Sequence, residues 1–166
     1  MMRRYLSIFL LLLTIGLCPA PSFSAEKGQG KVYVVDGDTF HINGQKIRIW
    51  GIDAVELHQT CLKSGQSYEC GKSARLHLQS VIGNNVPVCT ARPKSPKETR
   101  TVASCQVDGK DIGREMVKSG WALDYKHFSK GEYAAEEREA RENKRGIWSG
   151  EFQNPYVWRK NHKTYR

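Results

Sequence analysis

The stretch from Lys31 to Trp50 constrains the fold of this chain most strongly, because turn signals divide it into short β-rich runs. The run Lys31 to Val35 ends at an Asp-Gly-Asp turn, and the run Thr39 to Ile42 ends at Asn43-Gly44. An Asn-Gly pair between two β-rich runs is typical of a tight hairpin whose turn residues have positive φ. The sequence therefore predicts three consecutive strands, the last of them from Gln45 to Trp50.

The third predicted strand separates its side chains onto two faces, as strands do. Ile47 and Ile49 share one face, and Arg48 lies on the other. We therefore expect Arg48 to point away from whatever the two isoleucines pack on. Beyond this strand, Gly51 to Glu56 is predicted to be a loop.

The rest of the chain mixes helical and β-rich stretches. Helical spacing or composition, followed by glycine, predicts helices at Gly71–Val81, Ile112–Lys118 and Glu132–Lys144. Strands are predicted at Val86–Thr90 and Arg100–Val107, with a loop rich in Pro, Lys and Ser over Arg92–Thr99 and extended chain over Trp121–Tyr125. This order predicts an α+β fold that is mainly β, a five-stranded barrel of the oligonucleotide-binding (OB) type with about three helices.

Residues 1–25 have the organisation of an export signal. Arg3 and Arg4 precede an apolar run from Leu6 to Leu17 and then a small, turn-rich segment. The apolar run is shorter than the ~20 residues that a transmembrane helix needs. We therefore expect export to the periplasm or outside the cell, with an uncleaved membrane anchor as the alternative. The mature chain then has one domain, residues 26–150, and a basic, aromatic tail, residues 151–166.

The chain carries a formal charge of +9, and without residues 1–25 it keeps 24 basic and 17 acidic residues, a charge of +7. A basic domain of this size attracts polyanions such as nucleic acid, anionic membrane or acidic polysaccharide. Charge alone does not separate these partners, so the choice among them depends on the motifs.

Four cysteines follow the predicted signal: Cys61, Cys70, Cys89 and Cys105. An even count in an exported chain favours two disulfides, for which three pairings exist. We prefer Cys61–Cys70 and Cys89–Cys105, because each bond would close a short excursion between elements. The rival is a four-thiolate zinc site, but the spacings contain no C-x-x-C motif.

Acidic residues gather near the ends of the first and third predicted strands. Asp36, Asp38 and Asp53 come near one another once the hairpin forms, and carboxylate oxygens are ligands that Ca²⁺ prefers. Glu56 follows closely and can deprotonate a water, while Arg48 can bind phosphate with two N–H groups. The structural alternatives are a plain Asp-Gly-Asp turn and a strand-face salt bridge of Arg48 with Asp53 or Glu56.

The order of these residues resembles the active-site signature of the thermonuclease family, the staphylococcal nucleases. The signature consists of Val-Val-Asp-Gly-Asp-Thr over 34–39, a hairpin, and Ile-Arg-Ile-Trp-Gly-Ile-Asp-Ala-Val-Glu over 47–56. Further similar segments are Thr99–Ala103, Val107–Asp111, Arg114–Val117, Gly120–Ala122 and Gly146–Trp148. The similarity therefore covers, in order, nearly all of Lys31 to Trp148.

The resemblance implies a nuclease that depends on Ca²⁺, cuts DNA and RNA, and leaves 3′-phosphates. It implies that the calcium ligands are Asp38, Asp53 and the backbone carbonyl of Ala54, with Asp36 close behind them. It further implies Glu56 as the general base.

The resemblance also implies two catalytic arginines. Arg48 would bind the phosphate, and Arg100 would stabilise the transition state. A family region that supplies aromatic side chains for base stacking corresponds to Tyr125 and Phe128, which we expect, together with Lys97, to contact the substrate.

Several positions depart from the family pattern, among them Ala54, which replaces a threonine but needs only its carbonyl for the metal. Two others bear more directly on activity. Val55 stands where a proline is usual, so the loop that aims Glu56 is expected to be looser. Glu98 stands where an aromatic residue commonly packs near the nucleotide, and an acid there is expected to repel phosphate.

The sequence therefore predicts an exported, monomeric, calcium-dependent endonuclease of DNA or RNA, without stable membrane association once the signal is removed. One alternative is a non-catalytic module of the same family that binds nucleic acid or a protein in the cell envelope. A further alternative is a disulfide-stapled envelope protein that adheres to anionic surfaces by charge alone.

Overall fold

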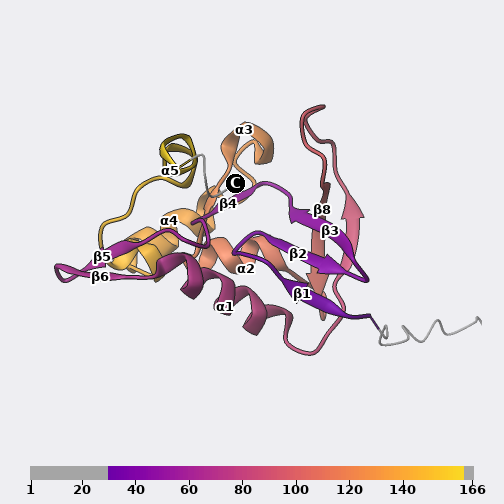
Figure 1. Cartoon of the computed structure of the whole chain (residues 1–166), viewed down its shortest axis with the longest axis horizontal. Helices are drawn as coiled ribbons and strands as arrows, with labels where there is room; N and C mark the ends of the chain where they lie inside the picture. The colour runs from indigo at the N-terminus through magenta and orange to yellow at the C-terminus, as the bar shows by residue number, and fades with distance from the viewer. Residues whose placement is uncertain (1–29, 163–166) are drawn as a thin grey trace, which may run out of the picture.

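The computed structural model describes residues 30–162 (Figure 1). The predicted export signal, residues 1–25, and the last four residues of the predicted tail lie outside the described residues. The strands are β1 Val32–Val34, β2 Thr39–Ile42, β3 Gln45–Ile49, β4 Ile52–Ala54, β5 Cys61–Lys63, β6 Gln66–Tyr68, β7 Val88–Ala91, β8 Thr101–Val107, β9 Lys110–Asp111 and β10 Ala122–Asp124. The helices are α1 Cys70–Ile82, α2 Ile112–Lys118, α3 Lys126–Ser129, α4 Ala134–Glu142, the 3₁₀ helix η1 Gly146–Ser149, and α5 Pro155–Asn161.

The main sheet has the strand order β1-β2-β3-β8-β7, and β9 pairs with β8. The β2–β3 hairpin turns at Asn43 and Gly44, which have φ of 51° and 83°, as an Asn-Gly turn requires. β3 pairs in parallel with β8, so Arg48 lies opposite Val102. This parallel pair matters for the site, because it brings the chain around residue 100 next to the hairpin.

The predicted barrel does not close among the described residues, since no pairing joins β7 to β1. β1 and β7, the strands at the two edges of the sheet, lie in different surroundings instead of pairing with each other. α1 packs against β1, while Val88 of β7 is 76% exposed. The fold is therefore a mixed α+β structure in which an open sheet is the main element, with five α-helices in the part that the structure describes.

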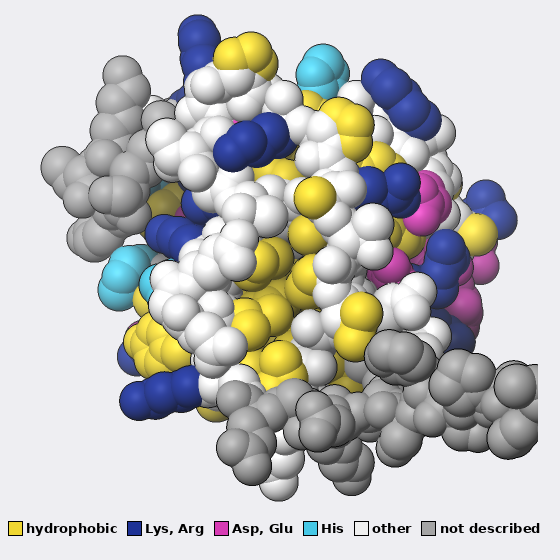
Figure 2. Space-filling view, turned by 90° about the vertical axis from the view of Figure 1, so that its right-hand side faces the viewer, with side chains coloured by type: hydrophobic (Ala, Val, Ile, Leu, Met, Phe, Trp, Pro, Cys, Tyr) yellow, Lys and Arg dark blue, Asp and Glu magenta, His cyan; other side chains and the backbone are white. Residues whose placement is uncertain are grey.

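The core lies between the sheet and the helices α1 and α2 and includes Phe40, Ile49, Leu78 and Met116. Ile47 and Ile49 are buried on the core side of β3, and Arg48 lies on the opposite, partly exposed face, as the alternation predicts. Lys and Arg side chains lie around the margin of the face shown in Figure 2, and apolar side chains show near its centre.

Several elements differ from the sequence prediction. Gly51 to Glu56 was expected to be a loop, but Ile52–Ala54 forms β4, which pairs with β10. The hairpin β5–β6 and the helices α3 and α5 were not predicted, because each is short and its sequence lacks a clear period. Within the predicted tail, Glu151 bridges to Leu62 and α5 buries Trp158, so this segment packs on the domain.

Both cysteine pairs preferred from the sequence are disulfide-bonded in the structure, Cys61–Cys70 and Cys89–Cys105. The first bond joins β5 to the start of α1, and the second joins two directly opposite residues of β7 and β8. Each bond thus ties together neighbouring elements within the domain.

Within residues 30–162, the structure contains no helix that is both long and apolar enough to cross a membrane.

We predict that replacing both Cys89 and Cys105 by alanine lowers the free energy of unfolding by about 3 kcal/mol, because the bond restricts the unfolded chain. Urea denaturation of the oxidised wild type and the double variant measures this difference. The reduced wild type is the comparison. Reductant breaks both disulfides, so the reduced protein should lose at least as much stability as the double variant. Equal urea midpoints for the oxidised wild type and the variant would contradict the prediction.

Candidate active site

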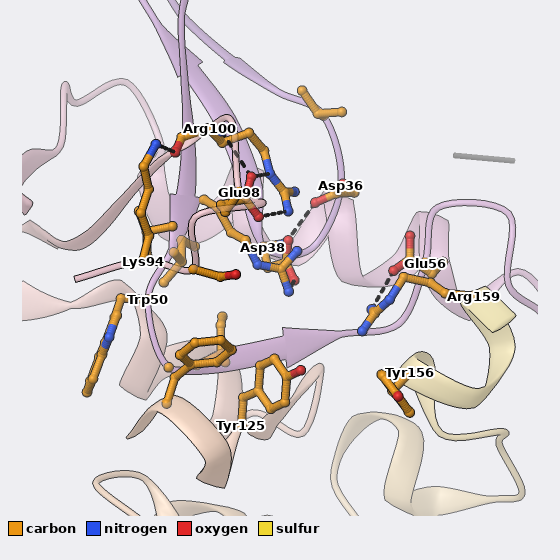
Figure 3. A pocket seen from close by; sticks show the side chains of 18 of the residues that line it. Asp36, Asp38, Trp50, Glu56, Lys94, Glu98, Arg100, Tyr125, Tyr156 and Arg159 are labelled. Atoms are coloured by element: carbon orange, nitrogen blue, oxygen red, sulfur yellow. Dashed lines mark hydrogen bonds and ion pairs between the residues drawn. The ribbon is translucent and has the colours of Figure 1, made fainter. Parts of the chain in front are cut away.

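Residues of α3, α5 and the connection between β7 and β8 contribute to the lining of a cavity of about 700 Å³, seen from close by in Figure 3. Figure 1 shows α3 and α5 on the same side of the molecule. The lining of the cavity comes from the β1–β2 turn, β3, the chain after β4, the β7–β8 connection, α3 and α5. Among the residues singled out from the sequence, those that line it are Asp36, Asp38, Arg48, Glu56, Lys97, Glu98, Arg100, Tyr125 and Phe128, whereas Asp53 and Ala54 do not. Side chains from distant parts of the chain therefore share one cavity.

The first acidic group is built by the turn between β1 and β2. Asp36 accepts a hydrogen bond from the backbone N–H of Asp38 at 3.0 Å, which fixes the turn. Asp38 is 4% exposed, and its Oδ2 lies 3.4 Å from the backbone N–H of Ala54 in β4. The turn and β4 are therefore linked directly through Asp38.

Thr39 is fully buried and connects this turn to the second arginine. Its hydroxyl donates to Asp38 Oδ1 at 2.9 Å and accepts from Arg100 Nη1 at 3.3 Å. Sequence reasoning did not assign a role to Thr39, although it belongs to the Asp-Gly-Asp-Thr motif.

Arg48 holds two of the predicted metal ligands together. Its Nη2 lies 3.0 Å from Asp38 Oδ2 and 3.1 Å from Asp53 Oδ1. Burial alone would lower the pKa of Arg48, but the charges of Asp38 and Asp53 raise it. The strand-face salt bridge considered from the sequence is thus present with Asp53. Arg48 and Asp38 line the cavity, whereas Asp53 lies behind Arg48.

A third arginine, which the sequence analysis did not single out, comes from α5. Arg159 Nη1 lies 2.8 Å from Asp53 Oδ1 and 2.7 Å from Glu56 Oε1, and Nη2 lies 3.0 Å from Asp53 Oδ2. Figure 3 shows this side chain reaching from α5 toward Glu56. The mixture of aromatic and basic residues in the tail was the available signal, but it did not distinguish Arg159 from its neighbours.

Arg100 is paired with Glu98, the acid that departs from the family pattern. Arg100 donates from Nε to Glu98 Oε1 at 2.8 Å and from Nη2 to Oε2 at 2.6 Å. These hydrogen bonds lower the pKa of Glu98 to about 2. Glu98 therefore neutralises the arginine that the sequence assigned to the transition state.

Crowding of buried carboxylates raises their pKa values. Burial is the largest cause for Asp36, whose pKa rises to about 7, and the neighbouring charge of Asp38 adds to it. Burial also raises the pKa of Asp53 and Glu56, partly offset by the hydrogen bonds from Arg159. The site thus disfavours additional negative charge unless a cation accompanies it.

Among residues 30–162, no three His, Cys, Asp or Glu side chains are grouped closely enough to hold a metal ion as they stand. The chemistry of the donors nevertheless fits calcium, because Asp38 and Asp53 offer carboxylate oxygens on either side of one guanidinium nitrogen. The cation between them in this structure is Arg48.

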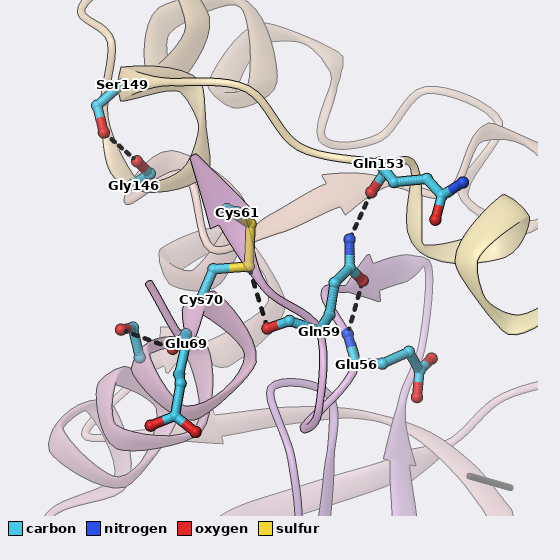
Figure 4. The surroundings of a disulfide bond; sticks show 9 residues. Glu56, Gln59, Cys61, Glu69, Cys70, Gly146, Ser149 and Gln153 are labelled. Carbon is cyan, nitrogen blue, oxygen red and sulfur yellow. Dashed lines mark hydrogen bonds between the residues drawn. A yellow bond between two sulfur atoms is a disulfide. The ribbon is translucent and has the colours of Figure 1, made fainter. Parts of the chain in front are cut away.

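The loop that carries Glu56 is firmly held, although Val55 replaces the usual proline. Val55 is 1% exposed, and the fully buried Gln59 accepts a hydrogen bond from the Glu56 N–H at 3.2 Å. Gln59 Nε2 donates to the carbonyl of Gln153 at 2.6 Å, and Cys70 Sγ of the first disulfide lies 3.4 Å from the Gln59 carbonyl (Figure 4). Contacts beyond the loop therefore hold the Glu56 backbone, while the looser loop expected from Val55 stays a prediction.

Aromatic and basic side chains form the walls of the cavity. Tyr125 and Phe128 meet edge to face with ring centroids 5.0 Å apart, and Tyr156 of α5 lines the cavity near Glu56. Lys94 and Lys97 line it from the β7–β8 connection. These walls combine π-faces and positive charge, as surfaces that bind single-stranded nucleic acid do.

Comparison with known proteins gives several similar sequences. Succinoglycan biosynthesis protein ExoI from Rhizobium meliloti (strain 1021) is 35% identical over 127 residues, which cover 75% of this chain and 66% of the relative. Probable staphylococcal-like nuclease CAN2 from Oryza sativa subsp. japonica is 30% identical over 145 residues, which cover 86% of this chain and 37% of the relative. Uncharacterized protein MJ1439 from Methanocaldococcus jannaschii is 27% identical, covering 89% of this chain and 95% of its own length.

The family described as staphylococcal nuclease homologue matches residues 46–150. The matched range contains Arg48, Asp53, Glu56 and Arg100, whereas Asp36 and Asp38 precede it and α5 follows it. Because the match covers more than half of the chain, this protein belongs to the staphylococcal nuclease homologue family.

Proposed function

We propose that this protein is a calcium-dependent endonuclease that hydrolyses phosphodiester bonds of DNA or RNA and leaves 3′-phosphates. One observation carries the proposal. Asp38, Glu56, Arg48 and Arg100 line one cavity. Arg48 also contacts Asp53 directly behind the lining, and Arg100 reaches Asp38 through the Thr39 hydroxyl. A protein that only binds nucleic acid has no need of this set.

Asp38, Asp53 and the backbone carbonyl of Ala54 would hold the calcium ion, with Asp36 supporting Asp38 from the turn. A bound calcium ion would neutralise charge on the phosphate and make an attacking water more acidic. Glu56 has an exposed flank in the cavity and would accept the proton of that water. Its raised pKa, caused mainly by burial, makes it a stronger base than an ordinary glutamate.

The two arginines of the family pattern would bind the phosphate. A guanidinium presents paired N–H groups that match two phosphate oxygens and stabilise the charge that develops there. Arg48 would bind the phosphate near the carboxylates, and Arg100 would stabilise the transition state from the other side of Asp38. In the structure both arginines are paired with acids, so substrate binding would exchange these partners for phosphate.

The walls of the cavity support a polynucleotide as the substrate. Lys97, Tyr125 and Phe128 line the cavity with Tyr156 and Lys94. Stacking on such rings tolerates any base, which fits an enzyme without strong sequence preference. The open, OB-like sheet would carry the strand across the site without requiring a free end, which favours endonuclease action.

We further propose that the protein acts outside the cytoplasm, in the periplasm or as a secreted monomer. The disulfides Cys61–Cys70 and Cys89–Cys105 support this location, because such bonds persist in oxidising compartments. The export signal predicted from the sequence over residues 1–25 agrees with it. Calcium outside the cell would load a weak site.

A second candidate is a non-catalytic binding module of the envelope. The observation that favours it is the internal pairing of Arg100 with Glu98 and of Glu56 with Arg159. The name of one relative, a succinoglycan biosynthesis protein, also differs from that of a nuclease. Assays of cleavage and of binding on the same variants separate the two candidates.

We predict that Glu56→Gln lowers calcium-stimulated digestion of plasmid DNA and RNA by a factor of about 10²–10⁴, because glutamine cannot accept the proton of the water. Binding of a single-stranded oligonucleotide should change little. Digestion is followed on gels with calcium, with magnesium and with chelator. Glu69→Gln is the matched control, since Glu69 is exposed and pairs with Lys72 outside the cavity. Equal digestion by wild type and Glu56→Gln would exclude the proposed mechanism.

We predict that Glu98→Gln makes oligonucleotide binding tighter and more sensitive to salt, because Arg100 becomes available to one more phosphate. In a Glu56→Gln background, which prevents cleavage, the slope of log affinity against log salt should steepen by about 0.7 for a single strand. Fluorescence anisotropy measures this slope. Glu139→Gln on α4 is the control, because Glu139 also pairs with an arginine, Arg145, but lies outside the cavity lining. An unchanged slope for Glu98→Gln would contradict the assignment of Arg100.

A further inference from the structure

The positively charged side chain of Arg159 contacts two acidic side chains of the site, Asp53 and Glu56. Both carboxylate oxygens of Asp53 accept from it, at 2.8 and 3.0 Å, and Glu56 Oε1 accepts at 2.7 Å. The Arg159 side chain is only 16% exposed. Burial alone would lower its pKa, but the hydrogen bonds and charge of Asp53 outweigh burial and raise it, so the guanidinium stays charged.

The helix that carries Arg159 is fixed to the domain rather than loosely attached. Asn154 caps α5 by accepting from the Tyr156 N–H, and Trp158, beside Arg159, is 8% exposed. Just before α5, the carbonyl of Gln153 accepts from Gln59, the residue that also holds the Glu56 loop. The position of the guanidinium is therefore set by packing, and α5 lies beyond the range 46–150 that the family match covers.

The contacts of Arg159 disfavour a calcium ion on the same oxygens, because the guanidinium occupies hydrogen-bonding positions and repels a second cation. Calcium needs several oxygen ligands, and Asp53 has both of its oxygens on guanidinium nitrogens. Oδ1 already accepts from two guanidinium groups, so a cation that binds Asp53 must displace a guanidinium there or share Oδ2 with Arg159, whose positive charge lies 3.0 Å away and repels it. Asp38 differs from Asp53. Among the described residues, Arg48 is the only arginine that pairs with Asp38, and it contacts Oδ2 alone.

We propose that Arg159 is a positioning residue that competes with calcium. It holds Asp53 and Glu56 in place when calcium is absent, and it raises the calcium concentration at which the site is loaded. This inference rests on the proposed function, since it takes Asp53 as a calcium ligand and Glu56 as the base. The occupant it competes with is a divalent cation, so its effect is measurable without substrate.

The test is calcium binding by the full, oxidised chain, measured by isothermal titration calorimetry on four proteins. Arg159→Gln removes the positive charge and the paired donors. We expect this variant to bind calcium about tenfold more tightly, because no ion pair of Asp53 and Glu56 with residue 159 has to break before the ion binds. Arg159→Lys keeps the charge but cannot bind two carboxylates through a planar fork, and its affinity should lie between those of the wild type and Arg159→Gln. Lys160→Gln is the control, because it removes one charge from the same helix at an exposed residue that contacts Tyr156 instead.

Thermal unfolding with and without calcium provides a second measurement and verifies folding. Arg159→Gln should be less stable than the wild type without calcium, because Asp53 and Glu56 lose their cation, and it should gain more stability when calcium is added. If all four proteins bind calcium equally tightly, Arg159 does not compete with calcium, although the proposed calcium site is retained. If Lys160→Gln tightens binding as much as Arg159→Gln does, the effect is general electrostatics and the inference is also wrong. If none of the proteins binds calcium, the proposed function itself fails.

Discussion

The structure depends on balancing four acidic side chains that crowd one corner, two of them buried and two partly exposed to the cavity. Asp36, Asp38, Asp53 and Glu56 would repel one another without cations, and burial already raises the pKa of Asp36 to about 7. Arg48 and Arg159 supply the positive charge, each by contacting two of the acids. The sheet, β4 and α5 all meet at these contacts, so the ion pairs link α5 to segments about a hundred residues earlier in the chain. A loaded site would keep this balance by exchanging internal ion pairs for a metal ion and a phosphate.

Much of the site could be predicted because it lies in a short stretch of sequence. The turn at Asp36 to Asp38, the alternation around Arg48 and the proximity of Glu56 all follow from local patterns of strand and turn. Arg100 was assigned only through family resemblance, and in the structure it is the parallel pairing of β3 with β8 that brings it to the hairpin. Arg159 could not be found in either way, because it lies 106 residues from Asp53 and its helix has no strong period.

The errors in the fold prediction have a common physical cause. The segment Gly51 to Glu56 is too short to show a strand period, and it becomes β4 only because β10, far along the chain, pairs with it. Barrel closure likewise depends on whether the outer strands find each other, and the packing of α1 against β1 is a tertiary contact that no local pattern reveals. The assignment of the family was less exposed to such errors, since it depends on the order of motifs rather than on element boundaries.

The contact between Gln59 and the first disulfide has a consequence for how the molecule matures. The amide that steadies the Glu56 backbone adjoins Cys70, whose bond to Cys61 forms only where thiols can be oxidised. A newly made chain with reduced cysteines possesses every acid and arginine of the centre but lacks the covalent tether beside the loop. Oxidation after synthesis would add that tether, so the Glu56 loop would acquire its last restraint only in an oxidising compartment, after the rest of the chain has folded.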